Sequence, residues 1–239
     1  MMDLFFGTTN PGKLRELRRL VAGLPIRVVS PDDLGRPIPE VEEDGDSFEE
    51  NAARKAAAFA RFAGVHALAD DSGLCVDALG GAPGVVSARW SDEEPGAAPA
   101  SPVCELPGAA AAELGPVAAR AARDERNNDK LLRLLANVPD PRRRAEYRAV
   151  LAVAAPDGTI VATADGVCRG RIGRERRGSG GFGYDPLFIP TGGQMSPAPP
   201  LTRERTMSEL SAEEKDAISH RGEAFRRLRA ALATLAAPP

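Results

Sequence analysis

Hydrophobic positions along the chain alternate between the period of a buried strand and the period of an amphipathic helix. An apolar run over residues 3–7 predicts a short buried strand near the start of the chain. The next apolar residues recur on one helical face, at Leu14, Leu17, Val21 and Leu24. Asn10 and Pro11 precede that face, and both residue types favour the first positions of a helix. The chain is therefore expected to open with a strand, a polar loop and a helix.

The same two periods continue through the rest of the chain. Further strands are expected over residues 65–69, 146–154, 159–164 and 187–189. Further helices are expected from a capping-box pattern at 47–50 to about residue 62, around residues 131–135, and along the apolar stripe 225–235. A turn at 156–158 joins two of the strands into a hairpin. Helices that alternate with strands, together with one hairpin, predict an α/β fold with a mixed sheet.

Two segments differ from the rest in composition. Ala, Pro and Gly make up 19 of the 36 residues from 91 to 126, and a second Pro- and Gly-rich stretch lies within 191–204. Such segments bury too little apolar surface to order firmly. We expect a single domain over residues 1–239, with mobile insertions at 91–126 and 191–204 and a short helix near residue 118.

Charge and composition narrow the classes of function. The 239 residues include 31 Lys and Arg against 34 Asp and Glu, so the formal charge is −3 and no basic excess favours nucleic acid or a membrane surface. No run of 18 apolar residues or basic leader is present, so neither a transmembrane helix nor a signal peptide is expected. Three cysteines without a CxxC pair favour a cytoplasmic location. Because there are only two histidines, any metal is expected on oxygen ligands.

The opening loop is the first candidate for chemistry. It consists of Thr8, Thr9, Asn10, Pro11, Gly12 and Lys13. A strand that leads through such a loop into a helix directs unpaired N–H groups and the positive end of the helix dipole at an anion. Gly12 permits close approach, and Lys13 adds a charge. The loop matches neither a Walker A nor a dinucleotide fingerprint, so an ordinary capped helix with a surface lysine is the alternative.

An acidic pair is the second candidate. Asp70 and Asp71 follow the expected strand at 65–69 and precede Ser72. Adjacent carboxylates need a cation or hydrogen bonds to offset their repulsion, and alternation along an extended backbone directs them apart. One or two carboxylates together with substrate phosphates suffice to hold Mg²⁺, and the acidic stretch around Glu42 offers a second carboxylate. A solvated turn is the alternative.

The remaining candidates lie in the last quarter of the chain. Glycines around Phe182 and Tyr184 leave both rings free to stack on a planar ligand, and Asp185 is placed to accept a base N–H. Packing in the core is the alternative for these aromatics. His220 and Arg221 are expected to begin a helix, where cations oppose the helix dipole. A polar substrate that uses both donors explains this placement, and an exposed basic turn is the alternative.

Taken in order, these segments resemble the motifs of the inosine/xanthosine triphosphate pyrophosphatase family. The matching segments are Thr8-Thr-Asn-Pro-Gly-Lys13 with Glu16, Ser47-Phe-Glu-Glu-Asn51 with Lys55, Ala69-Asp-Asp-Ser-Gly-Leu74, Ala78-Leu-Gly-Gly-Ala-Pro-Gly84 with Ser87-Ala-Arg89, Gly181-Phe-Gly-Tyr-Asp-Pro186, and Thr206-Met-Ser-Glu-Leu210 with Glu214-Lys215 and Ile218-Ser-His-Arg221. Six ordered matches, which together cover nearly the whole chain outside 91–126 and 191–204, are hard to produce by chance.

The resemblance implies an elongated mixed sheet flanked by helices, two lobes with a central cleft, and a homodimer. It also implies Mg²⁺-dependent hydrolysis of ITP, dITP or XTP to the monophosphate and pyrophosphate. Asp71 would be the general base and, with Glu42, a metal ligand, although Glu40 and Glu43 lie near and the choice among the three stays open. The residues implied in substrate binding are Thr8 to Lys13, Ser72, Phe182, Gly183, Tyr184, Asp185, Lys215, His220 and Arg221.

Two rival hypotheses accompany this interpretation. Donors at His220 and Arg221 suit the 6-oxo group of hypoxanthine or xanthine, because the 6-amino group of adenine would leave them unpaired. A pyrophosphatase for modified pyrimidine nucleotides is the first rival, and a nucleotide sensor that no longer hydrolyses is the second. The acidic pair argues against the sensor, since a pure binder gains nothing from clustered negative charge facing a triphosphate.

Overall fold

The computed structural model describes residues 1–35, 37–93, 116–191 and 204–237. Six strands are found there: β1 (Met2–Phe6), β2 (Ile26–Val29), β3 (His66–Val76), β4 (Arg144–Ala154), β5 (Ile160–Ile172) and β6 (Phe188–Pro190). The α-helices are α1 (Pro11–Leu20), α2 (Pro31–Leu34), α3 (Phe48–Ala63), α5 (Pro116–Leu134), α6 (Ala212–Ile218) and α7 (His220–Leu235). Short 3₁₀ turns are η1 (Asp77–Leu79), η2 (Gly84–Val86), η3 (Trp90–Glu93), η4 (Asp140–Arg142) and η5 (Met207–Glu209).

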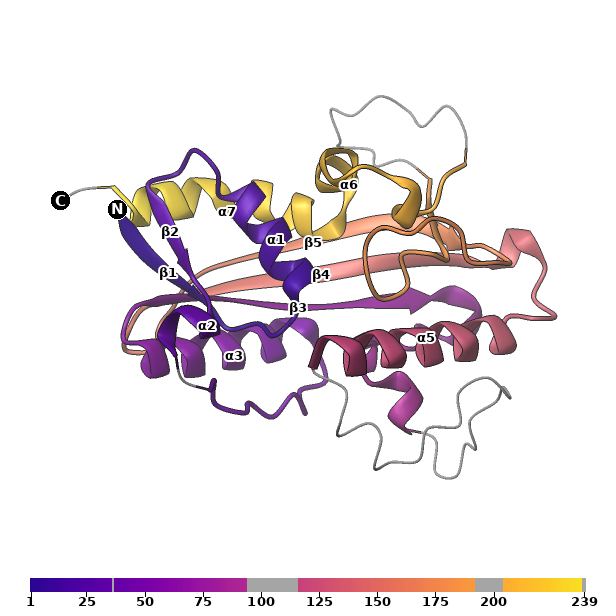
Figure 1. Ribbon diagram of the computed structural model, residues 1–239, viewed down its shortest axis with the longest axis horizontal. Coiled ribbons are helices and arrows are strands. Elements are labelled where there is room, and N and C mark those ends of the chain that lie inside the picture. Colours follow the sequence, from indigo (N-terminus) through magenta and orange to yellow (C-terminus); the bar gives the residue numbers. More distant parts are fainter. Residues whose placement is uncertain (36, 94–115, 192–203, 238–239) are drawn as a thin grey trace.

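The strands form one sheet in the order β2-β1-β3-β4-β5-β6. β1 is parallel to both β2 and β3, whereas β3, β4, β5 and β6 are antiparallel to their successive neighbours. In Figure 1, α1, α6 and α7 lie above the sheet, and α2, α3 and α5 lie below it. The mixed sheet between helices confirms the predicted α/β class. None of the described helices combines the length and the apolar character that crossing a bilayer requires.

β1 is too short to pair along the full length of β3, and this leaves a gap in the sheet. β1 pairs with β3 only as far as Phe6 opposite Leu68, while β3 continues to Val76. In the described part of the chain, no strand covers that edge of β3 between Ala69 and Gly73. The chain leaves β1 through residues 7–10 and begins α1 at this point. The gap therefore lies at the carboxyl end of β1, where open α/β sheets bind their ligands.

Successive side chains of β1 point to opposite faces of the sheet, so they belong to two different buried clusters. Leu4 and Phe6 pack with Leu228 of α7 in one cluster, while Phe5 packs with Phe59 of α3 in the other. A third cluster fills the far half of the molecule and includes Leu74, Leu131, Leu135, Tyr147, Ile172 and Phe188. The long strand β4 contributes to all three clusters, so it runs through both halves of the molecule. The gap in the sheet lies between these halves.

The course of β3 differs from the prediction. Its apolar run ends at Ala69, but its pairing with β4 continues without interruption from Ala67 to Val76. Asp70 and Asp71 therefore lie inside a strand and are only 6% and 4% exposed, so the alternative of a solvated turn is wrong. Backbone hydrogen bonds to β4 keep the strand extended where its apolar pattern stops. β2 and α2 were not predicted, because four residues are too few to show a period.

The region from 91 to 126 also differs from the prediction. In place of a short helix near residue 118, one continuous helix, α5, extends from Pro116 to Leu134, and η3 orders residues 90–93. The alanines and arginines of this region are strong helix formers, so a high content of small residues did not prevent helix formation here. The rest of the two predicted insertions, residues 94–115 and 192–203, lies outside the described residues.

Candidate active site

The loop between β1 and α1 forms a tight turn that caps the helix. The Oδ1 of Asn10 accepts hydrogen bonds from the backbone N–H groups of Gly12 at 2.9 Å and of Lys13 at 3.4 Å. The Thr8 hydroxyl accepts from the N–H of Asn10 at 3.1 Å. Two N–H groups of the helix are therefore satisfied within the turn. The Asn10 Nδ2 is buried and has no hydrogen-bond partner among the described residues, so this donor is left for a ligand.

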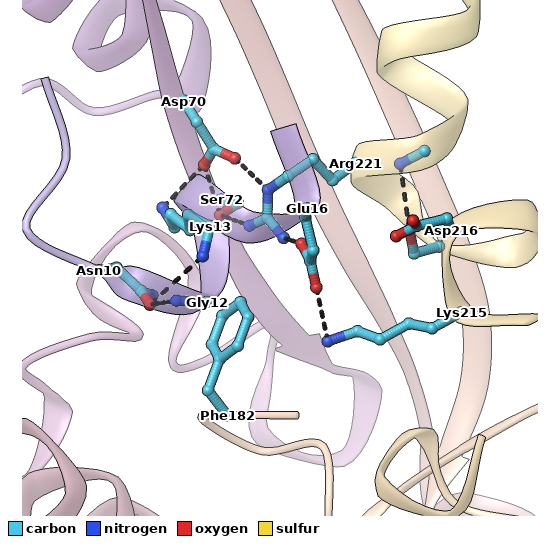
Figure 2. A network of polar contacts seen from close by, with 12 residues as sticks. Asn10, Gly12, Lys13, Glu16, Asp70, Ser72, Phe182, Lys215, Asp216 and Arg221 are labelled. Atoms are coloured by element: carbon cyan, nitrogen blue, oxygen red, sulfur yellow. Dashed lines mark hydrogen bonds and ion pairs between the residues drawn. The ribbon is translucent and has the colours of Figure 1, made fainter. Parts of the chain in front are cut away.

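A row of charges that alternate in sign lies at the gap in the sheet, and Figure 2 shows it from Lys13 to Lys215. In order, its members are Lys13, Asp70, Arg221, Glu16, Lys215 and Asp185. Each member contacts the next, and we call this set the charge row. It begins with an ammonium group 2.8 Å from the carboxylate of Asp70. The row connects α1, β3, α7 and α6 with the loop that precedes β6, so it links the two halves of the molecule.

Mutual pairing keeps Glu16, Asp70 and Arg221, the central members of the charge row, ionised although they are buried. Burial alone would raise the pKa of Glu16, but Arg221 and the Nζ of Lys215, at 2.9 Å, lower this pKa to about 2. Burial likewise opposes the ionisation of Asp70, yet Arg221 and Lys13 hold the pKa of Asp70 well below its usual range. The pKa of Arg221 is raised, because Asp70 and Glu16 outweigh the effect of burial. Removing one member would leave its neighbours as uncompensated buried charges.

Asp71, the next residue of β3, points to the other side of the strand. Its Oδ1 accepts a hydrogen bond from the Nζ of Lys55 on α3 at 2.7 Å. Its Oδ2 is buried and has no hydrogen-bond partner in the described part of the chain. Burial raises the pKa of Asp71, and Lys55 offsets this effect only in part. Lys13 also lowers the pKa of Asp71 electrostatically, which brings the two sides of β3 into one site.

The donor set beside Asp71 suits a hard cation. Glu43 lies 3.4 Å from the Nζ of Lys55, so two carboxylates flank one ammonium group. Among the described residues, no three His, Cys, Asp or Glu side chains cluster as a metal site. Two carboxylates, water and substrate phosphates would have to complete the shell, and Mg²⁺ is commonly bound in this way. Glu42 is exposed, whereas Glu43 faces Lys55, and the choice among Glu40, Glu42 and Glu43 stays a prediction.

The loop before β6 forms an aromatic wall of the cleft. The ring of Phe182 packs against the backbone of Gly12, with the ammonium group of Lys215 at 4.5 Å from its centroid. Asp185 accepts from the N–H of Phe182 at 2.9 Å and from Lys215 at 2.6 Å. Tyr184 is buried, and its hydroxyl donates to a backbone carbonyl at 2.9 Å. Core packing thus holds for Tyr184, while Phe182 remains available to stack on a ligand.

His220 differs in charge from the prediction. It lies at the start of α7 and stacks on Tyr147, with the ring centroids 4.7 Å apart and the planes 12° from parallel. Burial lowers the pKa of His220 well below its ordinary value, so the ring is neutral and not the expected cation. Its Nδ1 is buried and has no hydrogen-bond partner in the described ranges. A neutral imidazole donates or accepts through this nitrogen according to its tautomer.

Most of the predicted residues meet in one cleft, which holds about 70 Å³ of free space. Those that line it are Lys13, Ser72, Phe182, Gly183, Tyr184, Asp185, Lys215, His220 and Arg221. The loop residues Thr8, Thr9, Asn10, Pro11 and Gly12 lead up to it, while Asp71 and Glu42 lie outside its lining. The cleft is also lined by Arg120, Asp124 and Tyr147, which the sequence analysis did not single out, and by Ser87, which it placed in a family motif without a role. In the sequence, the spacing of four residues between Arg120 and Asp124 could have indicated that both lie on one face of a helix.

Fold and cleft together define an α/β protein with a charged, aromatic-walled site between two halves of a mixed sheet. The chain belongs to the Ham1 family, whose model matches residues 4–104 and 102–231. It is 72% identical over 235 residues to a dITP/XTP pyrophosphatase of Anaeromyxobacter sp. (strain Fw109-5), with 98% of each chain covered. It is 71% identical to the dITP/XTP pyrophosphatase of Anaeromyxobacter dehalogenans (strain 2CP-C), covering 98% of this chain and 99% of the relative.

Solved structures of similar proteins agree with this assignment. A HAM1 protein from Coxiella burnetii superposes with a TM-score of 0.71 at 32% identity, covering 98% of this chain and all of the other. A nucleoside-triphosphatase, dITP/XTP pyrophosphatase, from Mycobacterium abscessus superposes with a TM-score of 0.61 at 38% identity, covering 95% of this chain and 98% of the other.

Proposed function

We propose that the chain hydrolyses the non-canonical purine nucleotides dITP, ITP and XTP to the monophosphate and pyrophosphate, and that the reaction depends on Mg²⁺. The two Anaeromyxobacter relatives are named for dITP and XTP. The observation that carries the proposal is the Oδ2 of Asp71, which has no hydrogen-bond partner among the described residues and precedes Ser72, a residue that lines the cleft with Lys13 and Phe182. A triphosphate joined to a planar base matches Asp71, Lys13 and Phe182.

Binding of the triphosphate is supported by the loop that caps α1. Lys13 supplies a positive charge at the cleft, and Asn10 supplies a buried Nδ2 donor with no partner among the described residues. The N-terminus of α1 adds the positive end of its dipole. Hydrolysis of a phosphoanhydride depends mainly on positioning and on neutralisation of charge, which these groups provide together.

Asp71 is the general base in this proposal. A carboxyl group whose pKa is raised by burial binds a proton more strongly than an exposed one, and the Oδ2 of Asp71, which no described residue contacts by a hydrogen bond, can take the proton of the attacking water. The bond from Lys55 to Oδ1 fixes the orientation of the group. Mg²⁺, held by Asp71 and the predicted ligand Glu42, would neutralise phosphate charge and acidify a bound water.

Recognition of the base is assigned to His220 and Arg221, which line the cleft. His220, with its proton on Nδ1, can donate to the 6-oxo group of hypoxanthine or xanthine, whereas the 6-amino group of adenine would leave that donor unpaired. Arg221 already donates to Asp70, Glu16 and Ser72. Its remaining N–H groups are the ones available to a base.

Entry of a base requires Phe182 to move. The cleft has about 70 Å³ of free space, well below the roughly 300–1,000 Å³ of ligand pockets. The ring of Phe182 reduces the space, because it lies against Gly12. A purine that displaces the ring from Gly12 gains a stacking surface in the same step.

A cytoplasmic homodimer completes the proposal. The homodimer is supported by the family resemblance, and the location by the lack of paired cysteines in the sequence. Light scattering on the purified chain tests the first statement, with twice the mass of 25.2 kDa expected. Fractionation of the producing cells tests the second.

The function is tested by pyrophosphate release from dITP, ITP, XTP, GTP, ATP, dTTP and dUTP, each with and without Mg²⁺. We expect rapid release from the first three nucleotides, little release from the others, and none without the metal ion. Preferred hydrolysis of dTTP or dUTP would favour the pyrimidine rival. Binding of dITP without any release would favour the sensor.

A further inference from the structure

One face of α5 holds the loop that carries Phe182. The carboxylate of Asp124 accepts a hydrogen bond from the backbone N–H of Gly183 at 2.9 Å, and the Nδ2 of Asn128 donates to the carbonyl of Gly183 at 3.0 Å. These two side chains are four residues apart, so they lie on the same helix face. Gly183 has a positive φ of 62°, which side chains rarely adopt. The helix therefore fixes a turn that only glycine forms readily.

The same face continues one turn earlier with Arg120. This side chain lines the cleft together with Lys13 and Arg221, although its helix lies below the sheet and that of Lys13 above it in Figure 1. The Nε of Arg120 is buried and has no hydrogen-bond partner among the described residues. A donor that faces a cleft without a partner costs free energy unless a ligand accepts from it.

The nearby charges favour an anionic acceptor. No ion pair joins Arg120 to Asp124 in the described part of the chain, and Asp124 uses an oxygen on Gly183. Burial lowers the pKa of Arg120, and the positive charges of Arg123 and Arg221 lower it further, while the carboxylates of Asp124 and Asp70 oppose this shift without reversing it. An anion bound to the guanidinium of Arg120 would offset both the cost of its burial and the repulsion by Arg123 and Arg221. The planar guanidinium can donate two parallel hydrogen bonds to a phosphate.

We propose that Arg120 is a further substrate-binding residue, and that its guanidinium binds a phosphate oxygen of the nucleotide from α5, on the other side of the cleft from Lys13. This inference rests on the proposed function, in which the substrate is a nucleoside triphosphate. Asp124 and Asn128 act on the same helix face as positioning residues, because they hold Gly183 and touch no reacting atom.

The test compares Arg120→Gln with Arg123→Gln. Arg123 is also on α5, but it is about half exposed and pairs with Asp92 at 3.2 Å outside the cleft, so its variant has the same change of charge. We expect Arg120→Gln to raise KM about tenfold or more, in line with the loss of a charge-assisted hydrogen bond. The factor should be the same for dITP and XTP, which share the triphosphate. Arg123→Gln should leave KM unchanged, and Arg120→Lys should recover part of the loss.

Direct binding separates this inference from the proposed function. Calorimetry with inorganic pyrophosphate should show weaker binding to Arg120→Gln than to Arg123→Gln, whether or not the chain hydrolyses dITP. Equal affinities and equal KM values for the two variants would overturn the inference. A loss that differs between dITP and XTP would also overturn it, because Arg120 would then contact the base. Cooperative urea unfolding with the same midpoint as the unaltered protein checks that both variants are folded.

Discussion

Asp70 and Asp71 are neighbours on β3 with the same side chain and nearly the same burial, yet their surroundings are opposite. Asp70 lies between Lys13 and Arg221, and its pKa is far below the usual range. Asp71 has Lys55 on one oxygen and no hydrogen-bond partner on the other among the described residues, and its pKa is raised. The difference arises because successive side chains of a strand point to opposite sides.

The contrast separates a structural carboxylate from a reactive one. A carboxylate with a cation on each oxygen, as Asp70 has, is held in its ionised form and is a poor acceptor for a further proton. A carboxylate with an unpaired oxygen is costly to bury, and such groups are found where a metal ion or a proton is to be bound. Substitution of Asp71, Asp70 and Glu16 should therefore affect turnover, stability and pH dependence, respectively.

The largest expected effect is on turnover. Asp71→Asn should lower kcat by about 10² to 10⁴, the usual contribution of a positioned general base, while dITP still binds. Pyrophosphate release and calorimetry with dITP measure the two quantities. The free energy of unfolding should change little, because Lys55 retains Glu43. Unchanged turnover would contradict the assignment of the base.

The next effect is on stability. Asp70→Asn should lower the free energy of unfolding by about 3–5 kcal/mol, because Lys13 and Arg221 are left as buried charges with one partner fewer. Urea denaturation followed by circular dichroism measures the loss. Asp165→Asn is the matched control: this carboxylate pairs with Arg227 at 2.9 Å but is 61% exposed, so we expect at most about 1 kcal/mol. Equal losses of unfolding free energy for the two variants would show that the charge row stabilises the fold no more than an exposed ion pair does.

The smallest effect is on pH dependence. The pKa of Glu16 is lowered from 4.5 to about 2, so its contribution to stability is present above pH 4.5 and is lost as the pH falls toward 2. Between about pH 5 and about pH 3, this residue should account for about 2 kcal/mol of lost stability. Urea denaturation at several pH values should therefore show a shallower decline for Glu16→Gln than for the unaltered protein. Parallel declines would exclude Glu16 as a source of the stability lost at low pH.

The opening of the fold could be predicted because its signals are local. Asn10 and Pro11 mark the start of α1 within a few residues of the apolar face that follows. The course of β3 beyond Ala69 could not be predicted, because its acidic residues break the apolar pattern and the pairing with β4 that keeps them extended is not local. The extent of α5 was not predicted, because a count of Ala, Pro and Gly over residues 91–126 does not show that Pro116 is the last proline or glycine of this segment. The residues after it are free to continue as a helix.

The sequence indicated many of the residues that line the cleft, but not the contacts among them. Family motifs brought Lys13, Asp71 and Arg221 together, whereas the partner of Arg221, Glu16, is 205 positions away in sequence. Pairing at that distance depends on how α1 and α7 pack on the sheet. The charge of His220 was predicted wrongly for a similar reason, since the stacking on Tyr147 that buries its ring is a tertiary contact.

The shortness of β1 explains how two adjacent residues that point in opposite directions can both lie at one opening in the sheet. A hollow on the surface of a complete sheet would be reached by every second residue of a strand. Because β1 ends at Phe6, the middle of β3 is an open rim, and a ligand lying across that rim meets both sides of the strand. Only a longer β1, paired with β3 from Ala69 to Gly73, would close the rim and leave Asp70 and Asp71 on opposite faces of a continuous sheet.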